Sequence, residues 1–175
     1  LGHSPCKLLI ATANWLKMNH SATANEIIEV TQEELSRASL QKTPQEVLAV
    51  FVQPSYDLNP EVIKSSLCLA LDDVQDPGNL GTIIRLADWF GIEHIFCSTG
   101  TADVYNPKTV QATMGALARV KVHYCSLPQL IESLTDIPVY GTFLNGNIIY
   151  AESLSAHGLI VMGNEGKGVS LEVEK

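Results

Sequence analysis

The sequence has few basic residues. Its 175 residues include 11 lysines and arginines against 19 aspartates and glutamates, a formal net charge of −8. Both parts of the chain share this deficit, because residues 1–66 carry a net −2 (five basic, seven acidic) and residues 67–175 a net −6 (six basic, twelve acidic). Chains that bind nucleic acid usually show a basic footprint. Composition therefore lends no support to nucleic-acid binding, although local patches of charge matter more than the sum.

Long apolar runs and metal-binding patterns are also absent. No stretch approaches the 18 consecutive apolar residues of a membrane-spanning helix. The four cysteines lie far apart and form no Cys-x-x-Cys pair, which favours buried free thiols in a reducing cytoplasm over disulfides. The five histidines show no metal-ligand spacing. We therefore expect a cytoplasmic protein with no metal ion and no membrane segment.

Strand-like and helix-like segments alternate through the second part of the chain. Strands are expected at residues 67–74, 92–98, 120–124, 139–143 and 159–163, and helices at 80–90, 107–117 and 127–134. Alternation of this kind predicts an α/β fold with a parallel sheet and right-handed crossovers.

The first part of the chain contains shorter elements. A strand is expected at residues 7–12, a helical stretch at 14–19, an apolar run at 27–30 and a strand at 47–52. Thr31 and Glu34 have the spacing of a capping box, which predicts a helix that runs toward Leu40. The continuous apolar run at 47–52 is typical of a strand buried on both faces. These patterns predict a first α/β domain at residues 1–53, a linker at 54–66 and a second domain at 67–175.

Residues 72–85 form the most informative stretch. An apolar strand ends there, a turn with Asp76, Pro77 and Gly78 follows, and a helical period of apolar residues begins. Asn79 is expected to cap that helix. Open α/β sheets bind ligands where the carboxyl end of a strand meets the amino end of a helix. This stretch therefore predicts a binding site.

Three ordered motifs resemble one known family. Asn79, Gly81 and Arg85 have the spacing of the first signature of the SpoU/TrmH branch of the SPOUT superfamily. Residues 159–169, an apolar strand that runs into Gly-Asn-Glu, resemble the second signature, and residues 111–120 resemble the helix between them. The resemblance covers most of residues 67–175.

The resemblance implies an RNA methyltransferase. Its expected reaction transfers a methyl group from S-adenosylmethionine to a ribose 2′-hydroxyl, in a homodimer whose catalytic domain ends in a trefoil knot. Residues 40–50 are similar to the end of an L30e-like domain that binds the RNA substrate, which implies that residues 1–53 are part of such a domain. An extra domain of this kind favours ribosomal RNA as the substrate.

The same resemblance assigns roles to individual residues. Arg85, Asn79 and Glu165 are the expected catalytic set, and Arg85 and Arg119 are the expected RNA contacts. A guanidinium stays protonated, so Arg85 suits a clamp on the neighbouring phosphate better than a general base. The expected cofactor contacts are Thr142, Leu144, Met162, Gly163, Asn164 and Gly166.

Each of these side chains also has a purely structural interpretation. Arg85 could pair with Asp88 one turn further along the helix, a surface ion pair worth under about 1 kcal/mol. Asn79 could serve only as a helix cap, and Glu165 could be a solvated residue in a turn. Lys108 and Arg119 could be ordinary surface cations.

The third family signature, an Ile-Pro-Met-type strand end followed by a Ser-Leu-Asn helix start, does not follow Glu165. We therefore expect a fragment in which the knot is incomplete. Three alternatives stay open: a tRNA 2′-O-methyltransferase, a non-catalytic RNA- or ribosome-binding protein of the same fold, and a generic nucleotide-binding α/β domain. The last needs a glycine-rich turn after its first strand, and residues 76–79 fit that pattern poorly.

Overall fold

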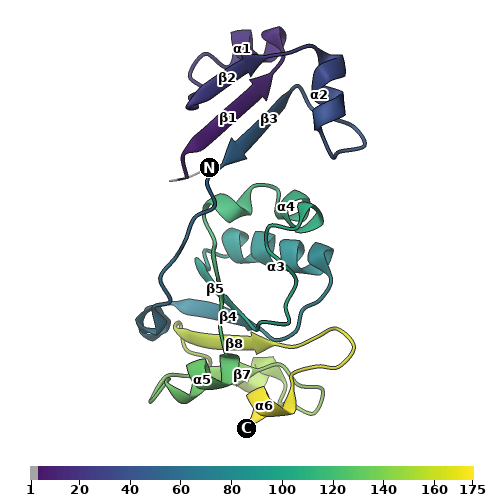
Figure 1. Cartoon of the computed structure of the whole chain (residues 1–175). Coiled ribbons are helices and arrows are strands. Elements are labelled where there is room, and N and C mark those ends of the chain that lie inside the picture. The colour runs from purple at the N-terminus through teal and green to yellow at the C-terminus, as the bar shows by residue number, and fades with distance from the viewer. Residues whose placement is uncertain (1–3) are drawn as a thin grey trace. The chain divides into compact units, whose positions relative to one another are not determined.

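A computed structural model describes residues 4–175, and it divides into two compact units (Figure 1). The smaller unit ends at Ser55, and the larger one spans Tyr56–Lys175. The first three residues of the predicted 1–53 domain lie outside the described residues.

The small unit is a three-stranded sheet with two helices. Its elements are β1 (Cys6–Ala11), α1 (Ala13–Met18), β2 (Glu26–Glu29), α2 (Gln32–Ala38) and β3 (Val47–Phe51), with the strands in the order β2-β1-β3. The predicted capping box is confirmed: the Thr31 side chain accepts from the Glu34 amide, and the Glu34 carboxylate accepts from the Thr31 amide at 2.8 Å. This reciprocal pair fixes the start of α2.

The prediction that the 47–52 strand is buried on both faces is wrong. No residue of β3 is buried, and Val50 is 46% exposed. The strand pairs antiparallel with β1 and forms an edge of its sheet. Continuous apolar runs signal two-sided burial in parallel sheets, and β3 does not belong to one.

The large unit is built on a five-stranded sheet, and its predicted parallel arrangement is confirmed. The strands are β4 (Leu67–Leu71), β5 (His94–Cys97), β6 (Lys121–Tyr124), β7 (Val139–Gly141) and β8 (Gly158–Met162). They lie in the order β6-β5-β4-β8-β7, and every neighbouring pair is parallel. Strand order therefore reverses at β4, which lies between β5 and β8.

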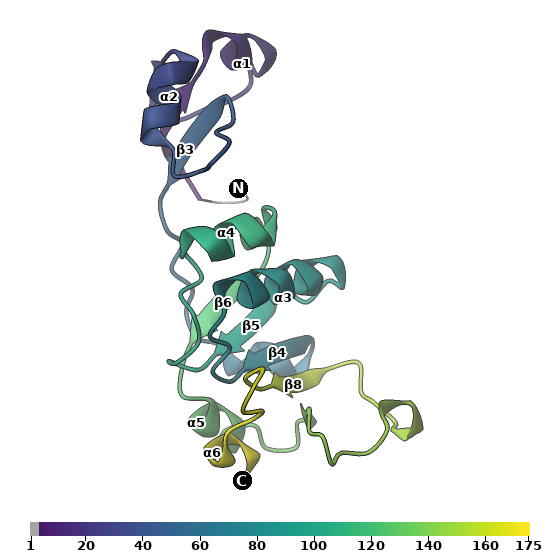
Figure 2. The same cartoon turned by 90° about the vertical axis from the view of Figure 1, so that its right-hand side faces the viewer.

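Helices cover both faces of this sheet (Figure 2). The helical elements are η1 (Pro60–Lys64), α3 (Pro77–Trp89), α4 (Pro107–Thr113), η2 (Ala116–Ala118), α5 (Leu127–Glu132), η3 (Ile149–Ala151) and α6 (Leu171–Glu174). The predicted 107–117 helix breaks after Thr113, because Met114 (φ 51°) and Gly115 (φ 89°) both adopt left-handed backbone that ends an α-helix.

Alternation along β4 divides the core into two layers. Leu69 and Leu71 pack with residues of α3 and β5, whereas Cys68 and Ala70 pack with residues of α5 and β8. Successive side chains of a strand point to opposite faces, and both faces here are covered. Part of the predicted linker belongs to the second layer, because Ile63 of η1 is fully buried in it.

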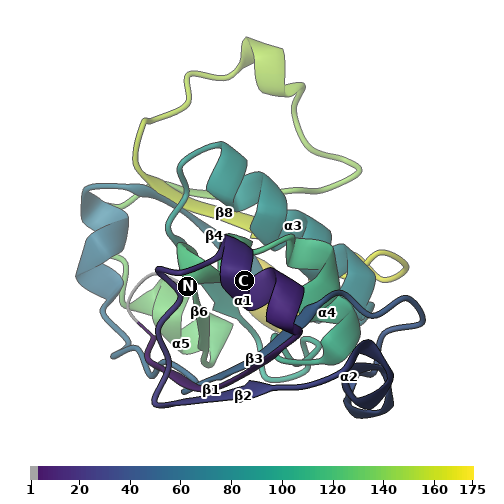
Figure 3. The same ribbon diagram turned by 90° about the horizontal axis from the view of Figure 1, so that it is seen from above.

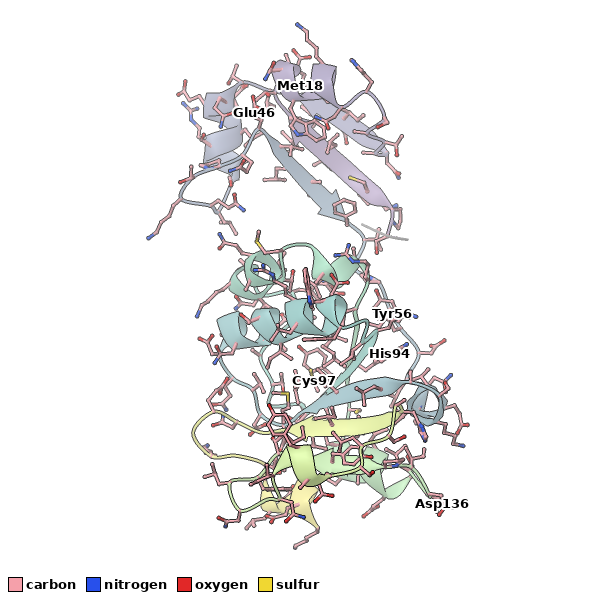
Figure 4. The ribbon with its side chains drawn as sticks, turned by 180° about the vertical axis from the view of Figure 1, so that it is seen from behind. Met18, Glu46, Tyr56, His94, Cys97 and Asp136 are labelled. Carbon is pink, nitrogen blue, oxygen red and sulfur yellow. The ribbon has the colours of Figure 1, made fainter. Side chains whose placement is uncertain are left out.

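The imidazole rings of His94 in β5 and His123 in β6 are stacked on each other. His123 is buried, its ring lies 5.4 Å from that of His94 with near-parallel planes, and the facing ring nitrogens are 3.1 Å apart. The Tyr56 ring also lies near His123, with 6.0 Å between the ring centroids, and Tyr56 and His94 are both labelled in Figure 4. Burial, helped by the charges of His94 and Lys121, lowers the pKa of His123 to about 4.

Stability should therefore fall as the pH drops from about 6.5 to about 4. In that window an unfolded histidine takes up a proton that the folded His123 does not, so acid favours unfolding by up to about 1.4 kcal/mol for each pH unit. Urea denaturation at several pH values measures this slope. We expect His123→Gln to make this slope shallower, with a remainder from His94, whose pKa burial also lowers, and His20→Gln, at an exposed position, to leave it unchanged. Equal slopes in the wild type and His123→Gln would contradict the assignment.

Helices α3 and α4 approach each other closely at Gly81. A Cβ atom built on Gly81 would lie 2.6 Å from both the Thr109 carbonyl oxygen and the Ala112 Cβ, and 3.2 Å from the Thr113 amide nitrogen. Two of these neighbours are backbone atoms that cannot turn aside. The glycine of the first motif therefore has a packing role that is independent of any ligand.

We expect Gly81→Ala to destabilise the large unit by about 1–3 kcal/mol, the usual cost of overpacking. Helix propensity alone would favour alanine by about 1 kcal/mol, so the sign of the change separates the two effects. Urea denaturation measures it. Thr82 is the next residue of the helix and is exposed, so the free energy of unfolding of Thr82→Ala should stay within about 0.5 kcal/mol of the wild-type value. A Gly81→Ala variant as stable as the wild type would show that the helices can separate at no cost.

Candidate active site

The candidate site lies where strand order reverses. In the β4–β8 pair, Leu71 faces Met162, so Asp72 and Gly163 are the residues that leave the sheet side by side. The Asp72 amide donates to the Met162 carbonyl at 2.8 Å and extends the pairing by one bond. Ligands of open α/β sheets bind at such a switch point, outside the carboxyl ends of the strands.

Helix α3 starts at this edge, and Asn79 does not cap it as predicted. The N-cap is Asp76, whose Oδ1 accepts from the main-chain N–H of Asn79 at 2.9 Å, and Pro77 occupies the first helical turn. Proline suits that position because its missing N–H would have no partner there. The Lys108 ammonium, 2.8 Å from Asp76 Oδ2, and the Asn79 amide together hold the pKa of Asp76 below its usual range. Asn79 therefore keeps its own side chain for another contact.

That contact joins the two halves of the site. Asn79 Nδ2 donates to Glu165 Oε1 at 2.8 Å, although the two residues lie 86 positions apart in the sequence. Both residues are exposed, so the pair lies open to solvent. The structure thus brings together Asn79 and Glu165, one from each of the two signature motifs.

The loop after β8 is folded around Asn164. Its Oδ1 accepts from the Gly166 amide at 2.9 Å and the Lys167 amide at 3.0 Å, and its Nδ2 donates to the Asp73 carbonyl at 2.7 Å. The main chain of Asn164 also pairs with that of Gly168 in both directions. This side chain therefore shapes the turn that carries Glu165 and anchors it to the end of β4.

Gly163 is required for a reason that differs from the expected one. A Cβ atom there would lie 2.1 Å from the Gly168 carbonyl carbon and 2.2 Å from the Val169 nitrogen. The close approach is made by the returning loop of the same chain, which fills the space beside Gly163. Its expected contact with a cofactor stays a prediction.

Three residues at this edge had no predicted role. Asp72 is buried, and its Oδ2 accepts from the Ser170 amide at 2.8 Å, which ties down the far end of the loop. The Asp73 amide donates to Ser98 Oγ at 2.9 Å, and the Ser98 hydroxyl donates to Asp73 Oδ1 at 3.2 Å. Two adjacent aspartates at the end of an apolar strand were the available sequence signal.

Arg85 does not form the surface ion pair considered for it. Asp88 instead accepts two hydrogen bonds of 2.7 Å from the Arg119 guanidinium, which lower the pKa of the Asp88 carboxyl. Arg85 is exposed, and among residues 4–175 no acidic group lies within ion-pair distance of it. It follows Asn79 by six residues, about 9 Å along the axis of α3.

Arg119 and Lys108 both form ion pairs with aspartates of the large unit. The Arg119 side chain is 63% exposed in its pair with Asp88, and the Lys108 side chain is 61% exposed in its pair with Asp76. The structure does not bring Arg119 to Asn79 or Glu165, and its contact with RNA stays a prediction.

The predicted adenosine-lining residues lie in the segment between β7 and β8. Thr142 is next to β8, where its amide (3.0 Å) and hydroxyl (3.1 Å) both donate to the Val161 carbonyl. Leu144 is fully exposed, and Figure 3 shows this lime-green segment as an open excursion from the sheet. The structure thus places Thr142 beside Met162 and leaves Leu144 in solvent.

Two absences concern the described part of the chain only. Within residues 4–175, no group of three or more His, Cys, Asp and Glu side chains is arranged to hold a metal ion. No helix in the same range is long and apolar enough to cross a membrane.

A parallel sheet covered on both faces, with polar residues at its switch point, is typical of α/β domains that bind ligands at that edge. The chain belongs to the SpoU rRNA Methylase family, whose model matches residues 66–175. The 23S rRNA (guanosine(2553)-2′-O)-methyltransferase RlmP of Bacillus subtilis is 34% identical over 143 residues, which cover 80% of this chain and 56% of that protein. The chain thus spans about half the length of this relative.

Solved structures of the family agree with this fold. A TrmH-family protein from Porphyromonas gingivalis has a TM-score of 0.86 and 42% identity, over 98% of this chain and 70% of its own. The SpoU methyltransferase AviRb of Streptomyces viridochromogenes, in complex with AdoMet, has a TM-score of 0.82 and 25% identity, over 98% and 71% of the respective chains.

We expect Gly163→Ala to displace the 163–170 loop and to destabilise the large unit by about 1–3 kcal/mol, because the new methyl group would overlap backbone atoms. Thermal denaturation measures the loss, and amide hydrogen exchange of the loop shows where it arises.

Gly166→Ala is the matched control in the same loop. A Cβ atom there would meet nothing closer than Asn164 Oδ1 at 3.6 Å, so its stability should stay within about 0.5 kcal/mol of the wild type. Equal losses in the two variants would mean that the loop tolerates no side chain anywhere, and would contradict the specific overlap at Gly163.

Proposed function

We propose that this chain is part of an S-adenosylmethionine-dependent methyltransferase that acts on a ribose 2′-hydroxyl of ribosomal RNA. The Asn79–Glu165 hydrogen bond carries this proposal, because it joins the two signature motifs into one site at the switch point. The names of the relatives support the substrate: RlmP and a Streptomyces viridochromogenes protein of 30% identity are both 23S rRNA 2′-O-methyltransferases.

Arg85 is the residue proposed to hold the RNA. Its guanidinium is exposed and has no carboxylate partner among the described residues, so an incoming phosphate displaces no ion pair. A guanidinium binds phosphate through two parallel hydrogen bonds, which fixes the orientation of the neighbouring ribose. It is a poor general base because it stays protonated. Positioning of the hydroxyl is therefore its proposed contribution to catalysis.

Asn79 and Glu165 are proposed to complete the catalytic set by holding the start of α3 against the β8 loop. Asn79 lies at the amino end of the helix that carries Arg85, and Glu165 lies in the turn shaped by Asn164. This contact holds α3 at a set distance from the loop, and so sets the position of Arg85 relative to that loop. Loss of either side chain would leave the two elements free to separate.

The residues at this edge suit S-adenosylmethionine. Met162 and Leu144 offer apolar surface, and the exposed Gly166 offers glycine backbone that a ligand can approach closely. Thr142, Gly163, Asn164 and Gly166 are the other proposed contacts. When bound, the cofactor supplies the methyl group that the reaction transfers. The AdoMet complex of AviRb supports this assignment.

The remaining proposals concern the architecture of the complete protein. The small unit is proposed to be part of an L30e-like domain that binds RNA, with residues 54–66 as the connection to the 67–175 catalytic domain. A trefoil knot, a homodimer and an RNA contact at Arg119 are proposed with it. An acidic chain needs such localised contacts, because its overall charge repels RNA.

We expect calorimetry to show saturable binding of S-adenosylmethionine to the complete natural protein. Arg85→Ala should leave that affinity within about twofold and lower methylation of ribosomal RNA by about 10²–10³-fold, the usual cost of a lost transition-state contact. Arg85→Lys should be intermediate, since it keeps the charge and loses the two-pronged contact.

Lys64→Ala is the matched control, because it removes an exposed cation of the large unit that pairs with Glu61. Its methylation rate should equal that of the wild type. A folded wild-type protein that binds no S-adenosylmethionine would overturn the enzyme assignment and favour a non-catalytic RNA-binding role.

A further inference from the structure

Asp73 has an unusual backbone for its residue type. Its φ is 54°, in the left-handed region that residues with a Cβ rarely adopt, although aspartate and asparagine do so more often than most. Glycine would adopt this conformation without strain. The presence of aspartate points to a use for the carboxylate at this position.

The carboxylate is held on one side by the β5 end. Ser98 follows β5, and it both accepts from the Asp73 amide and donates to Asp73 Oδ1. The same hydroxyl lies 3.3 Å from Thr101 Oγ1, which in turn donates to the Leu71 carbonyl. A Cβ atom at Gly100 would lie 2.0 Å from Asp73 Oδ1, so this glycine leaves the space that the carboxylate fills.

The main-chain carbonyl of Asp73 contacts the loop that follows β8. It accepts from Asn164 Nδ2 at 2.7 Å, and Asn164 shapes the turn that presents Glu165 to Asn79. A continuous series of hydrogen bonds therefore runs from Ser98, through Asp73 and the Asn164 turn, to the Asn79–Glu165 pair.

We propose that Asp73 is a positioning residue that fixes the 163–168 loop, and through it the Asn79–Glu165 pair and the proposed cofactor contacts. The hydrogen bonds between Ser98 and Asp73 hold the left-handed backbone of Asp73. That backbone sets the direction of the Asp73 carbonyl, which accepts from Asn164 Nδ2. This inference rests on the proposed function for its catalytic consequence. The ordering of the loop follows from the structure alone.

The first test is amide hydrogen exchange of the complete natural protein without ligand. Asp73→Gly keeps the backbone conformation and the main-chain amide, and it removes only the hydrogen bond from Ser98 to Oδ1. Exchange at residues 164–168 should therefore accelerate about tenfold or more, the size of one hydrogen bond to a charged group. Asp73→Asn keeps an oxygen that can accept from Ser98 and should restore slow exchange. Ser98→Ala should reproduce the effect without any change at Asp73.

Asp136→Gly is the matched control. Asp136 is also an aspartate with left-handed backbone (φ 62°), and it lies exposed in the turn between α5 and β7 (Figure 4). Its replacement should leave exchange at 164–168 unchanged. Unchanged exchange in Asp73→Gly and Ser98→Ala, or equal acceleration in Asp136→Gly, would overturn the proposal.

The second test separates positioning from general stability. With ribosomal RNA as substrate, Asp73→Gly should raise KM for S-adenosylmethionine about tenfold and change kcat less than threefold, and Asp73→Asn should reverse the change. An unchanged KM beside a loosened loop would overturn the positioning role. If the wild type binds no S-adenosylmethionine, the proposed function fails, and the exchange experiment alone decides whether Asp73 fixes the loop.

Discussion

The parallel pairing of β4 with β8 is the constraint on which the site depends. It joins segments about 90 residues apart and aligns Leu71 with Met162, so the two strands end at the same level. Four polar residues of the site follow those two ends: Asp72 and Asp73 after β4, and Asn164 and Glu165 after β8. A register shift of one residue would turn each core side chain of β8 to the opposite face, where it would meet a different set of closely packed neighbours.

Close backbone packing then sets which residues the site can use. Gly81 lets α3 lie against α4, and Gly163 lets the loop fold back on its own start. Both glycines belong to the signature motifs, yet each is explained by contacts within the chain. A motif glycine thus need not mark a ligand, because the same absence of a side chain serves packing between helices and within a loop. The polar members, Asn79 and Glu165, carry the stronger functional signal, since their side chains meet each other in solvent.

Much of the fold could be predicted from the sequence, because alternating apolar segments determine a parallel sheet wherever both faces are covered. Local sequence rules were less able to choose between competing residues for one structural role. Asn79 and Asp76 are both good N-caps, and Pro77 decides the choice by occupying the first helical turn. The apolar run of β3 gave no sign that it lies at an edge. The partners of Asp88 and Asp73 come from segments 25 or more residues away, and such pairings depend on tertiary structure that no local spacing encodes.

The distribution of ion pairs explains how an acidic chain keeps an arginine available for an anion. Asp88, about one turn beyond Arg85, is engaged by Arg119, and Asp76 at the cap of the same helix is engaged by Lys108. Each pair is exposed and contributes little to stability, so stability alone does not account for this arrangement. Its electrostatic consequence is that Asp88, paired with Arg119, does not compete for the Arg85 guanidinium. The same pairing neutralises two negative charges on α3 and its cap, and so lowers the repulsion that an acidic chain of net charge −8 would otherwise impose there on the proposed RNA substrate.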